Sequence, residues 1–321
     1  MKRATFVSVV FVALAFTGFA AAQSYPDHPV RIIVPYAPGG SLDTVARLVG
    51  KKLTDALGQQ IVIDNRGGGG GNIGVEAAVR SAPDGYTLLM GANGPISINP
   101  SLYHNLPFDP IKDLAPISTV VTTSLMLVVN PRLPVNSVGD LIALAKAKPG
   151  TINFGSAGSG STSHLSAELF KEMAGIDIVH IPYRGAGPAI RDVISGETQM
   201  MITAVVTTLP HVKSGKLKAL AVTGPKRLPI APQVPTIGEW LPGYEVVSWY
   251  GLFAPAKTPP AVIDRLHDAL VEILAAPDLR QHFVALGLDA STDTPRQFAH
   301  LIVAEKSKWA KIIQKTGTHP D

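Results

Sequence analysis

The sequence predicts an α/β protein in which parallel sheets are covered by helices on both faces. Short β-rich runs alternate along most of the chain with amphipathic runs of helical length, the pattern that such sheets require. Glycine turns join several of these strands to the helices that follow them. The apolar fraction of 46% is enough to form hydrophobic cores.

The elements follow one another in a regular order. Strands are expected at residues 30–34, 60–64, 86–90, 125–129, 151–154, 177–181, 200–203, 217–222 and 250–254. Helices are expected between them at residues 42–57, 72–81, 137–147, 162–174, 186–195 and 205–214. After residue 258 the pattern is helical only, at 259–275, 278–286 and 295–315, and prolines stand where these helices begin.

Two glycine turns lie between a strand and a helix. The first, Pro-Tyr-Ala-Pro-Gly-Gly-Ser-Leu-Asp at 35–43, should leave the amides of Gly39, Gly40 and Ser41 pointing outward and unpaired. The first amides of a helix lack internal partners and carry partial positive charge, so such a turn is an anion site. A similar unit recurs at 152–170. The pair suggests a small anionic ligand held between two lobes.

The first 22 residues have the layout of a secretory signal peptide. Lys2 and Arg3 precede an apolar run that ends at Ala22 in small residues suited to cleavage. A membrane anchor is the competing interpretation, since the run approaches the length of a bilayer span. Cleavage predicts an exported periplasmic protein of 299 residues, long enough for two lobes with separate cores.

The charge and the cysteine count exclude several classes of protein. Without Lys2 and Arg3 the chain has 26 basic and 24 acidic residues, which argues against a nucleic-acid footprint. The chain has no cysteine, so disulfides and thiol chemistry are excluded. No two of the nine histidines have metal-ligand spacing on one helix, and no metal site is expected.

Two segments are predicted to cross between lobes. They are residues 118–125, rich in Thr and Val, and residues 246–251, Val-Val-Ser-Trp-Tyr-Gly. Lobe one would then be discontinuous, formed by 25–120 and 252–321. Lobe two would be 125–247.

A glycine run and a serine-rich turn each invite another interpretation. Residues 66–74 contain a literal GxGxxG, but a run of five glycines satisfies almost any glycine spacing, and no acidic residue follows at the distance a ribose needs. A flexible strand–helix connection is favoured over a dinucleotide site. The turn at 155–163 contains no GxSxG, and no carboxylate can be assigned to His164, so a catalytic serine has little support.

Eight motifs occur in order along the mature chain, at residues 25–47, 63–71, Pro-Asp-Gly-Tyr-Thr-Leu-Leu 83–89, 153–165, Ile-Pro-Tyr-Arg-Gly 181–185, 215–223, 234–236 and Trp-Tyr-Gly-Leu-Phe-Ala-Pro 249–255. Through these motifs the whole mature chain resembles the Bug-type extracytoplasmic solute receptors of tripartite tricarboxylate transporters. The resemblance implies a type II, Venus-flytrap periplasmic binding fold with two lobes, each a sheet flanked by helices. It also implies no catalysis, no cofactor, and delivery of a carboxylate to a membrane permease.

The resemblance further implies that the turns opening the first helix of each lobe grip a ligand carboxylate. From lobe one these would be Gly39, Gly40 and Ser41. From lobe two they would be Ser156, Ser159, Gly160, Ser161 and Thr162. Ser41 and Ser161 also suit the plain role of helix caps.

Other candidate ligand residues each have a structural alternative. Arg184, after a strand, suits a bidentate clamp on a second carboxylate or a surface ion pair. Tyr36 suits stacking on an aromatic ligand or ordinary packing, and Asn93, after the strand expected at 86–90, is another candidate. His164 suits the orientation of serine hydroxyls better than direct contact. Trp249 and Tyr250 suit a wedge at the crossing better than ligand contact.

One position departs from the family pattern. Members commonly carry an acidic residue where this chain has Thr203, at a strand end facing the cleft. Loss of that charge removes a partner for a ligand ammonium. The expected solute is therefore a di- or tricarboxylate or an aromatic carboxylate, in preference to an acidic amino acid.

The predicted function is a monomeric, non-enzymatic receptor that closes on a small carboxylate and delivers it to the permease subunits. A sensor subunit that presents bound solute to a membrane kinase would have the same fold. An exported serine hydrolase is the alternative from another class.

Overall fold

The computed structural model describes residues 25–320. The predicted signal peptide and its cleavage site lie outside this range. Within it, none of the helices has the length and apolar character needed to cross a membrane.

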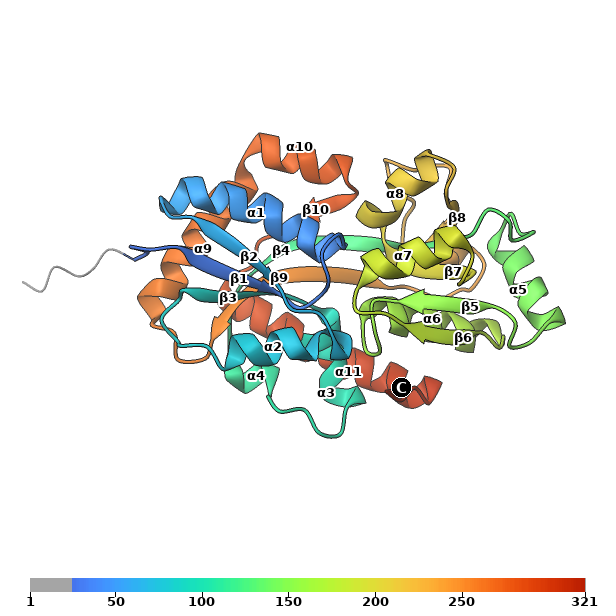
Figure 1. Ribbon diagram of the computed structural model, residues 1–321, viewed down its shortest axis with the longest axis horizontal. Coiled ribbons are helices and arrows are strands. Elements are labelled where there is room, and N and C mark those ends of the chain that lie inside the picture. The colour runs from blue at the N-terminus through green and yellow to red at the C-terminus, as the bar shows by residue number, and fades with distance from the viewer. Residues whose placement is uncertain (1–24, 321) are drawn as a thin grey trace, which may run out of the picture.

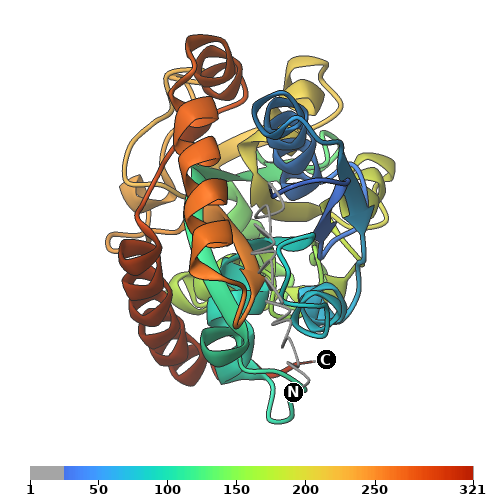
Figure 2. The same cartoon turned by 90° about the vertical axis from the view of Figure 1, so that its left-hand side faces the viewer.

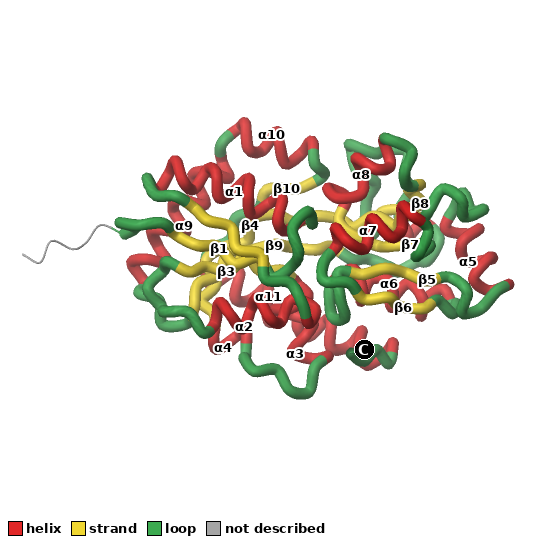
Figure 3. The backbone as a smooth tube through the Cα atoms, viewed as in Figure 1, coloured by secondary structure: helices red, strands yellow, loops and turns green. Residues whose placement is uncertain are grey.

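A single path of hydrogen-bonded strands runs through both lobes (Figure 1), in the order β2-β1-β3-β9-β4-β7-β5-β6, with β8 and β10 paired to β4. The tube view shows these strands enclosed by helices (Figure 3). The strand bounds are β1 Val30–Val34, β2 Ile61–Asn65, β3 Thr87–Ala92, β4 Leu114–Val129, β5 Asn153–Ser156, β6 Val179–Pro182, β7 Met200–Ala204, β8 Lys218–Val222, β9 Val247–Pro255 and β10 Leu288–Ala290.

The prediction of purely parallel sheets is correct only at the two ends of this path. Strands β2, β1 and β3 are parallel, and so are β6, β5 and β7. In the middle, β9 runs antiparallel to β3 and β4, and β4 runs antiparallel to β7 and β8. Residues 114–124 of β4 pair with β9, whereas residues 125–129 pair with β7 and β8. The 16-residue β4 therefore joins the two halves of the sheet.

The predicted helices are all present, and the structure adds two short ones, α3 and α4. The bounds are α1 Ser41–Leu57, α2 Asn72–Val79, α3 Asn99–Leu102, α4 Pro110–Asp113, α5 Val138–Ala147, α6 Thr162–Ala174, α7 Ala186–Ser195, α8 Val205–Lys213, α9 Pro260–Ala275, α10 Pro277–Ala285 and α11 Pro295–Thr316. Single turns occur at Gly69–Gly71 (η1), Gly94–Ile98 (η2) and Ile237–Glu239 (η3).

Each lobe has one hydrophobic core on each face of its sheet, because successive strand residues point to opposite faces. In β1, Ile32 packs into the core beneath α1 and α9, whereas Ile33 packs into the core beneath α2. In β7, Met200 packs toward α5 and α6, and Met201 packs toward α7 and α8. Figure 2 shows α9 (orange) covering the lobe-one end of the molecule.

Helix α11 packs against both lobes. Near its start, Phe298 lies in the lobe-one core with Trp249 and Phe253. Two to three turns later, Trp309 is fully buried in the lobe-two core. Lys315, at the end of the helix, forms an ion pair with Glu172 of α6 at 3.2 Å.

Candidate functional site

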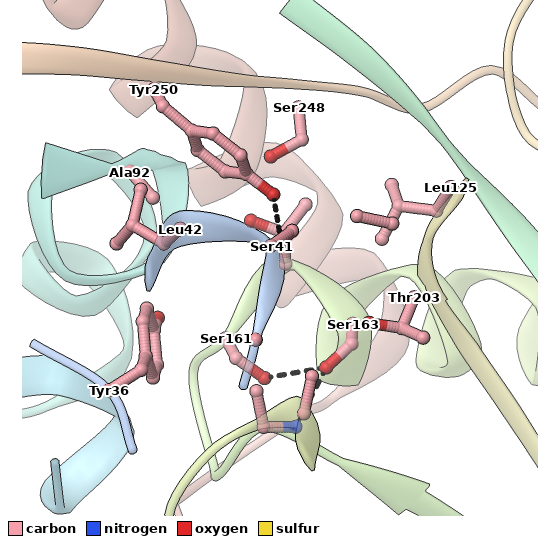
Figure 4. A pocket seen from close by; sticks show the side chains of 15 residues that line it. Tyr36, Ser41, Leu42, Ala92, Leu125, Ser161, Ser163, Thr203, Ser248 and Tyr250 are labelled. Carbon is pink, nitrogen blue, oxygen red and sulfur yellow. Dashed lines mark hydrogen bonds between the residues drawn. The ribbon is translucent and has the colours of Figure 1, made fainter. Parts of the chain in front are cut away.

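A cavity of about 50 Å³ lies where the two lobes meet. Its walls come from the first glycine turn, the serine-rich turn, the end of β3, the middle of β4, the β7–α8 junction and the start of β9. Hydroxyl, methyl and small apolar groups form the lining (Figure 4): Tyr36, Gly40, Ser41, Leu42, Ala92, Leu125, Ala157, Ser161, Thr162, Ser163, Ala186, Thr203, Ala204, Ser248 and Tyr250.

Four helices begin at this cavity. Helix α1 begins after Gly40, α6 after Ser161, α7 at Ala186 and α8 after Ala204, and all four of these residues are in the wall. Three of the helices, α1, α7 and α8, have no side-chain hydrogen bond at the N-cap. Each helix start carries about half an elementary positive charge, so the four together supply about two. This arrangement favours an anion.

The hydroxyl groups of the wall are tied into pairs. Ser41 Oγ and Tyr250 OH share a hydrogen bond of 2.5 Å, and Ser161 Oγ and Ser163 Oγ share one of 3.0 Å (Figure 4). Burial raises the pKa of Tyr250 to about 12, against smaller opposite effects of hydrogen bonds with Ser41 and Ser248. The phenol therefore stays protonated at neutral pH and can donate to an anion.

Within residues 25–320, the side chains that line the cavity carry no charge, and no group of three His, Asp or Glu is placed to hold a metal ion. Asp43, the carboxylate at the end of the first turn, does not line the cavity. Asp43 accepts hydrogen bonds from the Gly39 amide and Arg47 Nε, both at 3.1 Å. Burial would raise the pKa of Asp43, but these hydrogen bonds and the Arg47 charge outweigh it and lower the pKa.

Six of the residues predicted to bind ligand are in the cavity wall: Tyr36, Gly40, Ser41, Ser161, Thr162 and Thr203. Seven others lie outside it: Gly39, Asn93, Ser156, Ser159, Gly160, His164 and Arg184.

Packing within the turns explains several of these placements. The prediction that the Gly39 amide points outward unpaired is wrong, because Asp43 accepts it. In the second turn the Gly160 amide donates to His164 Nδ1 at 3.1 Å, which keeps both residues behind the wall. Ser156 is fully buried and shares a hydrogen bond of 2.6 Å with His180 Nε2.

Asn93 lies behind the wall and supports it. Its Oδ1 accepts hydrogen bonds from Ser248 Oγ at 3.0 Å and the Trp249 amide at 2.7 Å. Its Nδ2 donates to Glu305 of α11 at 2.8 Å. Asn93 thereby positions Ser248, which does line the cavity.

Ser159 and Arg184 lie in a separate groove between the lobes, which the glycine run at 67–70 also lines. The backbone of Arg184 meets lobe one there: its carbonyl accepts a hydrogen bond from the Ala37 amide at 3.1 Å.

Sequence reasoning missed much of the apolar wall and part of the polar wall. Ser163 belongs to the serine-rich turn and could have been included on that ground. Ala186 and Ala204 open helices without carrying any chemical signal of their own. Tyr250 was expected mainly as a wedge at the crossing that could also line the cleft, and it lines the cavity with its hydroxyl beside Ser41.

Known proteins agree with this architecture. A sequence model of the family described as "Tripartite tricarboxylate transporter family receptor" matches residues 45–318. Protein BugT of Bordetella pertussis is 38% identical over 322 residues, covering 99% of each chain. The structure of R. palustris Rpa4515 with adipate is 34% identical, with a TM-score of 0.90, over 92% of this chain and 100% of that one. MatC from Rhodopseudomonas palustris with bound malate is 31% identical, with a TM-score of 0.87, over 90% of this chain and 100% of that one.

The fold is that of the two-lobed periplasmic binding proteins, and the cavity lies between the two lobes. The chain belongs to the tripartite tricarboxylate transporter receptor family and is similar to the Bug proteins. The predicted fold class and family are confirmed.

Proposed function

We propose that this receptor binds a small dicarboxylate in the cavity between its lobes and delivers it to the permease subunits of a tripartite tricarboxylate transporter. The observation that carries the proposal is the meeting of four helix N-termini at a cavity lined by hydroxyl groups. Their combined partial charge, about two units, balances two carboxylates without a basic side chain. The similar proteins solved with adipate and malate support the same class of ligand.

The chemistry of the wall narrows the class. Among the described residues the wall offers no carboxylate, and Thr203 stands at the strand end where an acid would pair with an ammonium. An amino acid would therefore bury an unpaired positive charge near four helix N-termini, which is costly.

The wall also supports binding without chemical conversion. Ser41, Ser161 and Ser163 line the cavity, but no histidine or carboxylate among the described residues lines it with them. A serine nucleophile needs such a base within hydrogen-bond reach. His164 Nδ1 accepts the Gly160 amide instead.

We further propose that the solute is held by hinge closure. The lobes would be residues 25–120 with 252–321 and residues 125–247, and the bending segments would be 118–125 in β4 and 246–251 in β9. We propose that the receptor acts as a monomer in the periplasm after its leader is removed at about Ala22. Closure brings α6, α7 and α8 of lobe two against α1 of lobe one, so that the bound charge is enclosed by helix starts.

Calorimetric titration of matched acids tests the proposed class. Succinate and aspartate differ by one ammonium group, and so do glutarate and glutamate. We expect the dicarboxylate of each pair to bind at least about tenfold more tightly, equivalent to about 1.4 kcal/mol. Tighter binding of aspartate or glutamate would contradict the proposal, and so would the absence of heat with succinate, malate, glutarate and adipate alike.

A further inference from the structure

The glycine run at 67–71 has no part in the cavity wall, although it is the most unusual stretch of the sequence. It connects β2 to α2 at the edge of lobe one, and η1 is formed within it. It lies against two segments of lobe two, the serine-rich turn at 158–160 and the β6–α7 turn at 183–185.

The backbones of the two lobes approach each other here more closely than any side chain would allow. A Cβ atom added at Gly70 would lie 1.9 Å from the carbonyl oxygen of Ser159. A Cβ atom added at Gly67 would lie 2.7 Å from the carbonyl oxygen of Arg184 and 2.9 Å from the Ala37 amide nitrogen. Neither gap admits a methyl group without movement of the backbone.

Hydrogen bonds across the same seam hold the lobes together. The Ala37 amide donates to the Arg184 carbonyl at 3.1 Å, directly beside Gly67. Tyr103 OH, from the segment after α3, donates to the Ser159 carbonyl at 3.0 Å, beside Gly70. These contacts join segments of different lobes, so under the hinge closure proposed above they exist only when the lobes are closed.

We propose that the glycine run is a closure latch. Its lack of side chains lets lobe-one backbone dock on the carbonyls of Ser159 and Arg184, outside the ligand cavity. A contact made only in the closed form shifts the population toward that form. The latch therefore sets how often the receptor closes and how slowly it releases its solute, without touching the solute.

Conformation alone is a competing reason for glycine at these positions. Gly70 has φ +62, a left-handed value that disfavours any residue with a side chain. Gly58 provides a matched control, because it has φ +70 but nothing within 4 Å of an added Cβ atom. Gly70→Ala and Gly58→Ala share the backbone strain and differ in the inter-lobe clash.

A disulfide reporter can measure closure without ligand. The protein has no cysteine of its own, so an introduced pair reacts only with itself. Gly40 and Ala186 lie on opposite lobes, and a Cβ atom at Gly40 would be 3.9 Å from that of Ala186, which suits a disulfide. With the Gly40→Cys/Ala186→Cys pair in the mature chain, the rate of oxidation by a fixed concentration of diamide reports the fraction of closed molecules.

We expect Gly70→Ala to slow this cross-linking at least about tenfold, and Gly58→Ala to change it less than about twofold. The reason is that an added methyl group clashes with lobe two only at Gly70. Equal rates in the two variants would overturn the latch. Circular dichroism and thermal melting show whether both variants fold.

Tyr103→Phe keeps the test decisive if Gly70→Ala does not fold. It removes the hydroxyl that donates to Ser159 and adds no bulk, so we expect cross-linking to slow by about threefold or more. An unchanged rate in this variant would also count against the latch. Because the reporter needs no solute, failure of the latch is distinguishable from failure of the proposed dicarboxylate ligand, which calorimetry tests separately.

Discussion

At the scale of single residues, hydroxyl groups are the polar side-chain groups of the cavity wall, and no charged side chain of the described residues lines it. Tyr250 OH comes from β9 and Ser41 Oγ from the start of α1, and their 2.5 Å contact joins the strand that connects the lobes to the first helix start. Both atoms can turn toward a carboxylate, because each can donate one hydrogen bond. The affinity of the site should then depend on these hydroxyls.

Tyr250→Phe removes one of them. We expect the dissociation constant for the best dicarboxylate to rise about tenfold, the effect of losing one hydrogen bond to a charged acceptor. Tyr244→Phe is the matched control, because Tyr244 is equally buried but donates to the Ser166 carbonyl at 2.9 Å inside lobe two. Titration calorimetry on both variants measures the difference, and equal affinities would show that Tyr250 does not meet the ligand.

Thr203→Asp places a carboxylate in the wall. We expect it to weaken binding of succinate at least about tenfold by like-charge repulsion, and to narrow or reverse the preference over aspartate. Thr203→Ser keeps a neutral hydroxyl and should leave both affinities within about threefold of the original. Titration of both acids into both variants tests this. Unchanged selectivity in Thr203→Asp would mean that Thr203 does not set it.

The residues predicted best from the sequence were those that open helices after a strand. Ser41 was predicted from that pattern, Ser161 and Thr162 from the pattern together with the family resemblance, and all three lie in the wall. Asn93 and His164 have the same residue chemistry as ligand contacts, but both are engaged elsewhere. His164 accepts the amide of Gly160 within its own turn, whereas Asn93 contacts Ser248 and Glu305. Local sequence carries no sign of these distant partners of Asn93.

At the scale of elements, α11 connects the two lobes. Trp309 is fully buried in the lobe-two core, and its Nε1 donates to Glu305 Oε2 at 2.9 Å. Glu305 in turn accepts from Asn93 at the end of β3. The helix therefore links the lobe-two core to the back of the cavity wall.

Trp309→Ala should lower the free energy of unfolding by about 3–5 kcal/mol, as expected for a fully buried tryptophan. Trp240→Ala provides the comparison, because the Trp240 side chain is 47% exposed, and should cost less than about 1 kcal/mol. Urea unfolding followed by circular dichroism measures both values. Similar losses would show that the C-terminal half of α11 does not pack as described.

The pairing of Arg227 with Glu239 in the single turn η3 should make the stability of the protein depend on pH. Hydrogen bonds from Arg227 lower the pKa of Glu239 to about 2, helped by the Thr236 amide. A lowered folded-state pKa gives stability that is present above the ordinary value of 4.5 and is lost as pH falls toward about 2. The difference in urea midpoint between the original protein and Glu239→Gln should therefore shrink between pH 6 and pH 2. A constant difference would contradict this pairing.

Element order was largely predictable, whereas strand direction was not. Each amphipathic run produced the expected helix, because periodicity and proline or glycine boundaries are local properties. The antiparallel pairing of β4 and β9 depends on segments more than one hundred residues apart. The three-residue strand β10 forms by pairing with β4, and its own sequence shows no strand pattern.

At the scale of the whole molecule, the two lobes are joined through β4 and β9 and enclose a cavity formed by both. The sequence showed the two glycine turns and their likeness to each other. That the turns face one another follows only from the course of β4 and β9 through the sheet. We propose that bending in these two strands opens the cavity.

Small-angle X-ray scattering of the mature protein, with and without a saturating concentration of the dicarboxylate that binds most tightly, tests this closure most directly. The account predicts a smaller radius of gyration with the bound dicarboxylate than without it. An identical radius with and without bound dicarboxylate would contradict capture by closure of the two lobes.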